Sequence, residues 1–143
     1  MSPEETKPEK PLLDKLGVKP DARVLVLGVD DEEFLAELRG RTDGIVIEAP
    51  TSARPTSASR YDAIFVAVNE PQDMEQFAEL KRAIKPDGAV WAVFRKGRKD
   101  FNENDILRGG LAAGLVDVKV VRFSETHTAS KFVIRKAERG RLQ

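Results

Sequence analysis

The sequence predicts a three-layer α/β domain with a mainly parallel sheet, and three observations support that prediction. Short, continuously apolar runs alternate with longer amphipathic segments, which is the order of a parallel sheet covered by helices. The last two apolar runs are joined by a link short enough for an antiparallel pair. At 143 residues and without an internal repeat, the chain has the length of one domain.

Six segments are predicted to be strands because they are short, apolar and rich in β-branched residues. The earliest of them are almost uninterrupted apolar runs, as strands buried on both faces are. Residues 85–88, KPDG, are predicted to turn the chain into the fourth strand. The six strand segments span residues 23–28, 44–49, 61–68, 89–94, 116–123 and 130–136.

Three segments are predicted to be helices, and a shorter helix precedes the first strand. Asp30 or Asp31 can cap the first helix, and Pro71 suits the first turn of the second. Gly109 and Gly110 weaken the third, because glycine is a poor helix former. The helices span residues 31–40, 71–84 and 104–113, and the short helix spans residues 12–17.

The folded domain is expected to cover residues 12–137. Residues 1–11 hold three prolines and several charges with little apolar character, which is typical of a disordered tail. Residues 138–143 are predicted to form a C-terminal tail. Residues 50–60 are rich in Pro, Ser and Thr and lack periodicity, which indicates a polar loop.

Composition narrows the classes of function. The chain carries 24 basic and 24 acidic residues, so no overall field draws it to nucleic acid, and such a partner is not expected. It has no cysteine, which excludes disulfides, thiolate metal sites and a cysteine nucleophile. No apolar run approaches the length of a membrane helix, and the first residues lack the apolar core of a signal peptide. We therefore expect a soluble, cytoplasmic protein.

Four phrases, in order, resemble the class I S-adenosylmethionine-dependent methyltransferases, which have a Rossmann-like fold. They are PLLDKLGVKPDARVLVLG (11–28), LKRAIKPDGAVWAVF (80–94), GLAAGLVDVKVVRF (110–123) and KFVIRK (131–136). Only a short polar segment separates the second and third predicted strands, so the family's third strand is expected to be missing. The resemblance then implies the strand order 2-1-4-5-7-6 in the family's numbering. The shortened chain also resembles small bacterial proteins grouped as a family of unknown function.

The resemblance places the cofactor site after the first strand. The family's acidic strand residue aligns with Val26 and its first glycine with Gly28, but the next two glycine positions hold Asp30 and Glu32. Glu48 stands where the family has the acid that accepts the ribose hydroxyls. Carboxylates add bulk and negative charge beside a helix N-terminus, so we expect no cofactor, or S-adenosylmethionine if the site is retained.

Asn69 is the candidate catalytic residue, and the resemblance also assigns it to the cofactor site. The chain reads NEPQ at 69–72, where amino-methyltransferases place a polar residue that holds the target amine. Alternatively, Asn69 or Glu70 caps the next helix and Pro71 occupies its first turn. Our preferred hypothesis is a non-catalytic binding or interaction module, and an active methyltransferase with an altered pocket is the alternative.

A basic loop follows the fourth predicted strand, at the sheet edge where α/β folds bind ligands. Its cations could bind an anion or a nucleic-acid backbone, or pair with the acids at 30–33 on the same edge. His127, the only histidine, is predicted to lie in a solvent-facing loop. Consecutive acids on one helical turn point in different directions, so no metal site is expected. The partner and oligomeric state are not indicated. The loop's cations are Arg95, Lys96, Arg98 and Lys99.

Overall fold

The computed structural model describes residues 12–48 and 61–136, which fold into a six-stranded sheet with helices on both faces. The strands are β1 (Arg23–Leu27), β2 (Gly44–Glu48), β3 (Tyr61–Ala67), β4 (Ile84–Arg95), β5 (Leu115–Arg122) and β6 (His127–Ile134). The helices are α1 (Leu12–Lys15), α2 (Glu32–Arg41), the 3-10 helix η1 (Pro71–Gln76), α3 (Phe77–Ala83) and α4 (Glu103–Ala112).

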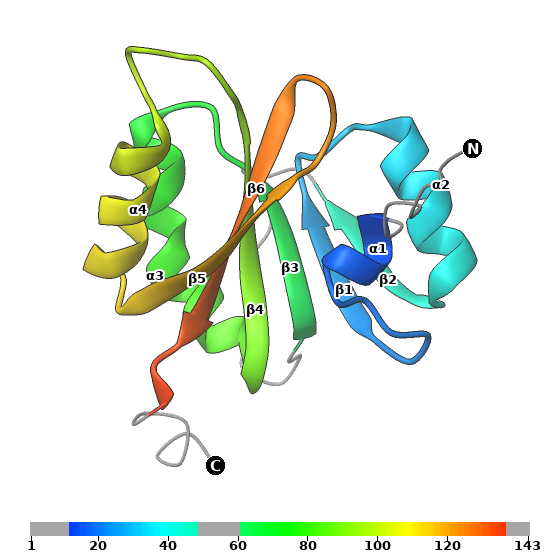
Figure 1. The fold of residues 1–143 in the computed structure, drawn as a ribbon. Helices are drawn as coiled ribbons and strands as arrows, with labels where there is room; N and C mark the ends of the chain where they lie inside the picture. The colour runs from blue at the N-terminus through cyan, green and yellow to red at the C-terminus, as the bar shows by residue number, and fades with distance from the viewer. Residues whose placement is uncertain (1–11, 49–60, 137–143) are drawn as a thin grey trace, which may run out of the picture.

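The strands lie in the order β2-β1-β3-β4-β6-β5 (Figure 1). β1 pairs in parallel with β2 and β3, and β3 pairs in parallel with β4. β6 runs antiparallel to both β4 and β5, which makes the C-terminal hairpin the antiparallel part of the sheet. This is the predicted order 2-1-4-5-7-6 in the family's numbering, so the prediction of fold is confirmed. Among the described residues, β2 forms one edge of the sheet.

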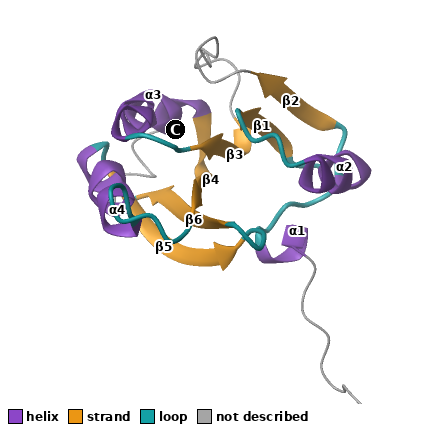
Figure 2. Ribbon diagram, turned by 90° about the horizontal axis from the view of Figure 1, so that it is seen from above, coloured by secondary structure: helices purple, strands orange, loops and turns teal. Residues whose placement is uncertain are grey.

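The three layers are visible when the molecule is viewed from above (Figure 2). α3 and α4 cover one face of the sheet, where the rings of Phe77 and Phe132 meet edge to face at 5.7 Å. α1 and α2 cover the other face, where Phe65 and Trp91 stack at 6.1 Å. Trp91 is 1% exposed, as expected for a core residue. Because both faces are covered, β1, β3 and β4 are buried throughout most of their length.

Three element boundaries differ from the sequence predictions. The segment predicted as one helix over residues 71–84 begins as the 3-10 helix η1 and becomes α-helical at Phe77. β4 starts at Ile84, before the predicted KPDG turn, because this segment already pairs with Tyr61 of β3. β6 starts at His127, three positions before the predicted strand, because β4 and β5 flank it on both sides. Pairing to both neighbours extends a strand past its apolar run.

Some predictions fall on residues that the structure does not describe. These are the N-terminal tail at 1–11, the polar loop at 50–60 and the C-terminal tail at 138–143. None of the helices in the described part of the chain combines the length and the apolar character needed to cross a bilayer.

Candidate functional site

Gly28 makes the turn that joins β1 to the segment leading into α2. Its φ is 77°, in the left-handed region where a side chain costs about 1–2 kcal/mol. The strand before it is held firmly, because residues 24–27 are all buried in the sheet. Gly28, which aligns with the first glycine of the family's motif, therefore makes a left-handed turn at the carboxyl end of β1.

Asp31 caps the N-terminus of α2. Its carboxylate Oδ1 accepts a hydrogen bond from the Phe34 amide at 3.0 Å, and Glu32 and Glu33 lie in the first turn. This arrangement satisfies one of the free donors of the helix and complements its dipole. Asp30, one residue earlier, is exposed at the carboxyl end of β1. The helix N-terminus that could receive a ligand's carboxylate is thus partly occupied by the chain's own acid.

Asn69 lies just beyond the end of β3, and its backbone is fixed from two sides. Its amide donates to Asp73 Oδ2 at 2.8 Å, and its carbonyl accepts from the Arg98 guanidinium. Asp73 Oδ2 also accepts from the Glu70 amide at 3.0 Å. Glu70 is the N-cap residue of η1, and Pro71 follows it in the first turn. The capping interpretation holds for Glu70 and Pro71, while Asn69 itself precedes the cap.

These chain segments enclose a cleft of about 300 Å³ at the carboxyl ends of β1, β3 and β4. Its size is at the lower end of the range for ligand pockets, about 300–1,000 Å³. Among the described residues that line it, only Asp30 and Asp31 carry a carboxylate, and none is a lysine or an arginine. The described residues that line it are Gly28, Val29, Asp30, Asp31, Ala67, Asn69, Val93, Phe123, Thr126 and His127.

A second cavity of about 540 Å³ adjoins the cleft between α1, α2 and the β5–β6 turn. The two cavities share Asp31, Phe123 and Thr126, so a ligand too long for the cleft can extend past these residues. The ring of Phe34 packs against the rings of Phe65 and Phe123, with centroid distances of 5.1 and 4.8 Å. Phe34 lines the second cavity and is absent from the lining of the cleft.

His127 is the site residue that the sequence did not reveal, and its prediction as a solvent-facing loop residue was wrong. It is half-buried, begins β6 opposite Arg95 of β4, and lines the cleft. Its ring nitrogen Nδ1 lies 2.8 Å from the Thr126 hydroxyl. The position follows from topology: β6 is antiparallel to β4, so the start of β6 meets the end of β4. If the strand order had been combined with the full length of β6, His127 could have been placed beside the end of β4 from the sequence.

The basic loop is only partly available for a ligand. Arg98 forms a bidentate ion pair with Asp100, with contacts of 3.1 and 2.8 Å, and lies 5.7 Å over the Phe101 ring. The hydrogen-bonded Arg98 guanidinium holds the pKa of Asp100 below its usual value. The predicted pairing of the loop with the acids at 30–33 does not occur among the described residues. Arg95, Lys96 and Lys99 are exposed.

Glu48 and the other acidic residues were the sequence's candidates for binding a ribose or a metal ion. Glu48 ends β2, in register with Leu27, so its backbone is one strand away from Gly28. In residues 12–48 and 61–136, no group of three or more His, Asp or Glu side chains is placed to hold a metal ion.

The cleft suits the cationic groups of S-adenosylmethionine better than its carboxylate. The left-handed Gly28 turn and the two carboxylates suit the cationic sulfonium and ammonium groups. The amino-acid carboxylate is less well served, because Asp31 already occupies a donor at the N-terminus of α2. The residues therefore fit the cation of this cofactor, and its nucleoside would need the adjoining cavity.

Comparison with known proteins places the fold. No protein-family model and no curated protein sequence matches the chain. A SAM-dependent methyltransferase from Aquifex aeolicus superposes with a TM-score of 0.66 at 16% identity, over 87% of this chain and 88% of that one. A putative methyltransferase from Thermoplasma acidophilum gives 0.61 at 10% identity, over 92% and 77%. A DhpI–SAH complex gives 0.63 at 13% identity, over 87% and 83%. The chain has the class I methyltransferase fold.

Proposed function

We propose that this chain is a binding module that takes a small cationic ligand in the cleft at the carboxyl ends of β1, β3 and β4, without catalysing methyl transfer. S-adenosylmethionine is the first candidate for that ligand. The observation that carries the proposal is the cleft itself, which is open beside Gly28 and lined by Asp30 and Asp31 with no lysine or arginine among its described residues. A cofactor-free module is less well supported, because a structure of this fold holds S-adenosylhomocysteine.

The charge of the cleft predicts its preference between two related ligands. S-adenosylmethionine carries a sulfonium cation that S-adenosylhomocysteine lacks. A single favourable charge pair at about 4 Å contributes about 1 kcal/mol in water and more when partly desolvated. We therefore expect S-adenosylmethionine to bind about five- to tenfold more tightly than S-adenosylhomocysteine.

Methyl transfer is the second candidate function. It is favoured by the cavity that adjoins the cleft, which leaves room for an acceptor next to Asp31, Phe123 and Thr126. Against it stands the Asn69 carbonyl, which is occupied by Arg98 and so is not offered to a target amine. Incubation with methyl-labelled S-adenosylmethionine and a metabolite extract tests it. Label transferred by the chain, and lost in Asn69→Ala, would favour the transferase over the binding module.

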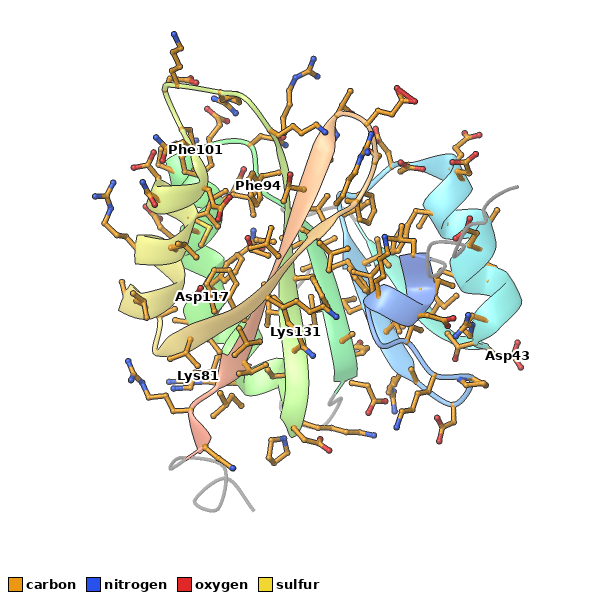
Figure 3. All side chains as sticks on the ribbon, viewed as in Figure 1. Asp43, Lys81, Phe94, Phe101, Asp117 and Lys131 are labelled. Carbon is orange, nitrogen blue, oxygen red and sulfur yellow. The ribbon has the colours of Figure 1, made fainter. Side chains whose placement is uncertain are left out.

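Calorimetric titration with both ligands tests the binding proposal. We expect weak, saturable binding of S-adenosylmethionine, with a Kd between about 10 μM and 1 mM. Asp30→Asn should weaken it several-fold. Asp43→Asn is the matched control, because Asp43 is also exposed but lies at the opposite end of α2 (Figure 3).

Two results would contradict the proposal. Equal or tighter binding of S-adenosylhomocysteine, especially below about 10 μM, indicates an ordinary cofactor site that does not select a cation. No saturable heat with either ligand at millimolar concentration means that the cleft does not recognise this class of cation.

A further inference from the structure

The β5–β6 turn contains a chain of hydrogen bonds that ends at the imidazole of His127. The Ser124 hydroxyl oxygen accepts from the His127 amide at 3.1 Å and from the Thr126 amide at 3.3 Å. The hydroxyls of Ser124 and Thr126 lie 3.4 Å apart, and Thr126 Oγ1 lies 2.8 Å from His127 Nδ1. The His127 carbonyl in turn accepts from the amides of Phe123 and Ser124, both at 3.1 Å. The turn is therefore fixed by its own hydrogen bonds.

Counting donors and acceptors gives this chain a direction that satisfies each of its contacts. A serine hydroxyl has two acceptor lone pairs and one proton. Both acceptor positions of Ser124 are taken by backbone amides, so its proton is the one available to the Thr126 oxygen. Thr126 then keeps one proton and one lone pair, and its contact with His127 Nδ1 is satisfied when Thr126 donates that proton. A neutral imidazole whose Nδ1 accepts carries its proton on Nε2.

From this we infer that His127 is a ligand-binding residue that presents a hydrogen-bond donor, Nε2–H, at the cleft, and that the ligand carries an acceptor such as a carboxylate near its cationic group. His127 lines the same cleft as Asp30 and Asp31. The carboxylates recognise the cation and the imidazole recognises the acceptor, so the ligand class is an amino-acid-like zwitterion or a conjugate of one. At the N-terminus of α2 the Phe34 amide already donates to Asp31 and is not available to a ligand. His127 supplies a hydrogen-bond donor in its place.

The inference rests on the proposed function only in that it uses the same cleft. The assignment of the proton can be measured without any ligand. Because His127 is the only histidine, the imidazole nitrogen signals of the chain belong to it without ambiguity. Nitrogen-15 NMR at about pH 8.5, where imidazoles in general are neutral, should show the proton on Nε2. Thr126→Val removes the hydroxyl and keeps the shape of the side chain. The imidazole of this variant should be a mixture of the Nδ1–H and Nε2–H tautomers. A wild-type proton on Nδ1 would overturn the inference.

The ligand class is tested by pairing a variant with a change in the ligand. The probes are S-adenosylmethionine and its decarboxylated form, which keeps the sulfonium and the amine but lacks the carboxylate. His127→Phe should weaken S-adenosylmethionine about tenfold and leave the decarboxylated form unchanged, since only the first has an acceptor for Nε2–H. His127→Gln, which keeps a side-chain N–H donor, should retain most of the affinity for S-adenosylmethionine that His127→Phe loses. Thr126→Val should lower the affinity for S-adenosylmethionine by less than His127→Phe does.

Failure of the inference and failure of the proposed function give different results. Equal weakening of both probes by His127→Phe, or no weakening of either, overturns the inference while leaving the cationic cleft in place. If neither probe binds the wild-type chain, the proposed function fails, and the ligand class inferred from His127 fails with it. The nitrogen-15 measurement still decides the direction of the hydrogen-bond chain in that case.

Discussion

The guanidinium of Arg98 donates a hydrogen bond to the backbone carbonyl of Asn69, which ties the loop after β4 to the end of β3. The same guanidinium is paired with Asp100 and lies over Phe101, which is buried at 3% exposure on the α3–α4 side of the sheet (Figure 3). One basic side chain therefore fixes the backbone of a cleft residue. The remaining cations of the loop stay exposed.

Replacing Arg98 should loosen the loop while the sheet stays intact. Arg98→Ala removes all three contacts, and Arg98→Lys cannot reproduce the bidentate pair. We expect faster amide hydrogen exchange for residues 96–101 and for Asn69 in Arg98→Ala, and an intermediate rate in Arg98→Lys. Lys99→Ala is the control because Lys99 is exposed on the same loop. Equal rates in Arg98→Ala and Lys99→Ala would show that Arg98 does not anchor the loop.

Phe34 should be a major contributor to stability, because it joins α2 to the sheet through Phe65 and to the end of β5 through Phe123. It is 2% exposed. Phe34→Ala is expected to lower the free energy of unfolding by about 3–5 kcal/mol. Urea unfolding followed by the fluorescence of the single tryptophan, Trp91, measures this. Leu111→Ala, at a side chain 45% exposed, should change it by less than about 0.5 kcal/mol. A loss below 1 kcal/mol for Phe34→Ala would contradict the packing described.

Two helical glycines should respond to alanine with opposite signs. A β-carbon at Gly40 of α2 meets nothing within 4 Å, so Gly40→Ala should stabilise the chain by about 0.5–1 kcal/mol. A β-carbon at Gly110 of α4 would overlap the Phe132 ring, so Gly110→Ala should destabilise it by about 1–3 kcal/mol. Thermal and urea unfolding of the two variants compare them directly. Stabilisation by both substitutions would mean that α4 does not pack as closely on β6 as the structure shows.

Acid should destabilise the fold partly through Asp105. Its pKa is lowered, first by the hydrogen bond from the Asn102 amide at 2.9 Å and then by Arg108. Because the pKa is lower in the folded chain, ionised Asp105 contributes its full stabilisation above the ordinary aspartate pKa, about 3.9. This stabilisation is lost as the pH falls through the pKa that Asp105 has in the folded chain. Urea midpoints measured from about pH 7 downward should fall less steeply for Asp105→Asn than for the wild-type chain. Asp117→Asn, on the exposed edge strand β5 (Figure 3), should follow the wild-type curve.

The fold could be predicted from the sequence because its strands are encoded locally. Residues 24–27 and 63–66 are apolar without interruption, and both runs are buried on the two faces of the sheet. The effect of Gly110 was not predicted fully. The sequence indicated that this glycine weakens α4, whereas in the structure it allows α4 to pack closely on Phe132. Tertiary packing, which local propensity does not contain, decided that position.

The site could be predicted only in part. Gly28, Asp30 and Asn69 were found because motif spacing fixes their place at the ends of β1 and β3, and the structure brings them to one cleft. His127 and Thr126 were missed because they belong to the predicted link between the last two strands, 99 and 98 residues after Gly28 in the sequence. They reach the cleft only through the antiparallel pairing of β6 with β4. The role of Arg98 depends on a contact with Asn69 across 29 positions of sequence, which no local pattern records.

Amide NMR can show whether the cleft at the carboxyl ends of β1, β3 and β4 is a ligand site. The nitrogen-15-labelled chain would be titrated with S-adenosylmethionine while the amide signals are followed. We expect saturable shifts of the amide signals of Gly28, Asp30, Asn69 and His127, and no shift for Asp43. Shifts confined to the basic loop at 95–99, or no saturable shift anywhere, would contradict it.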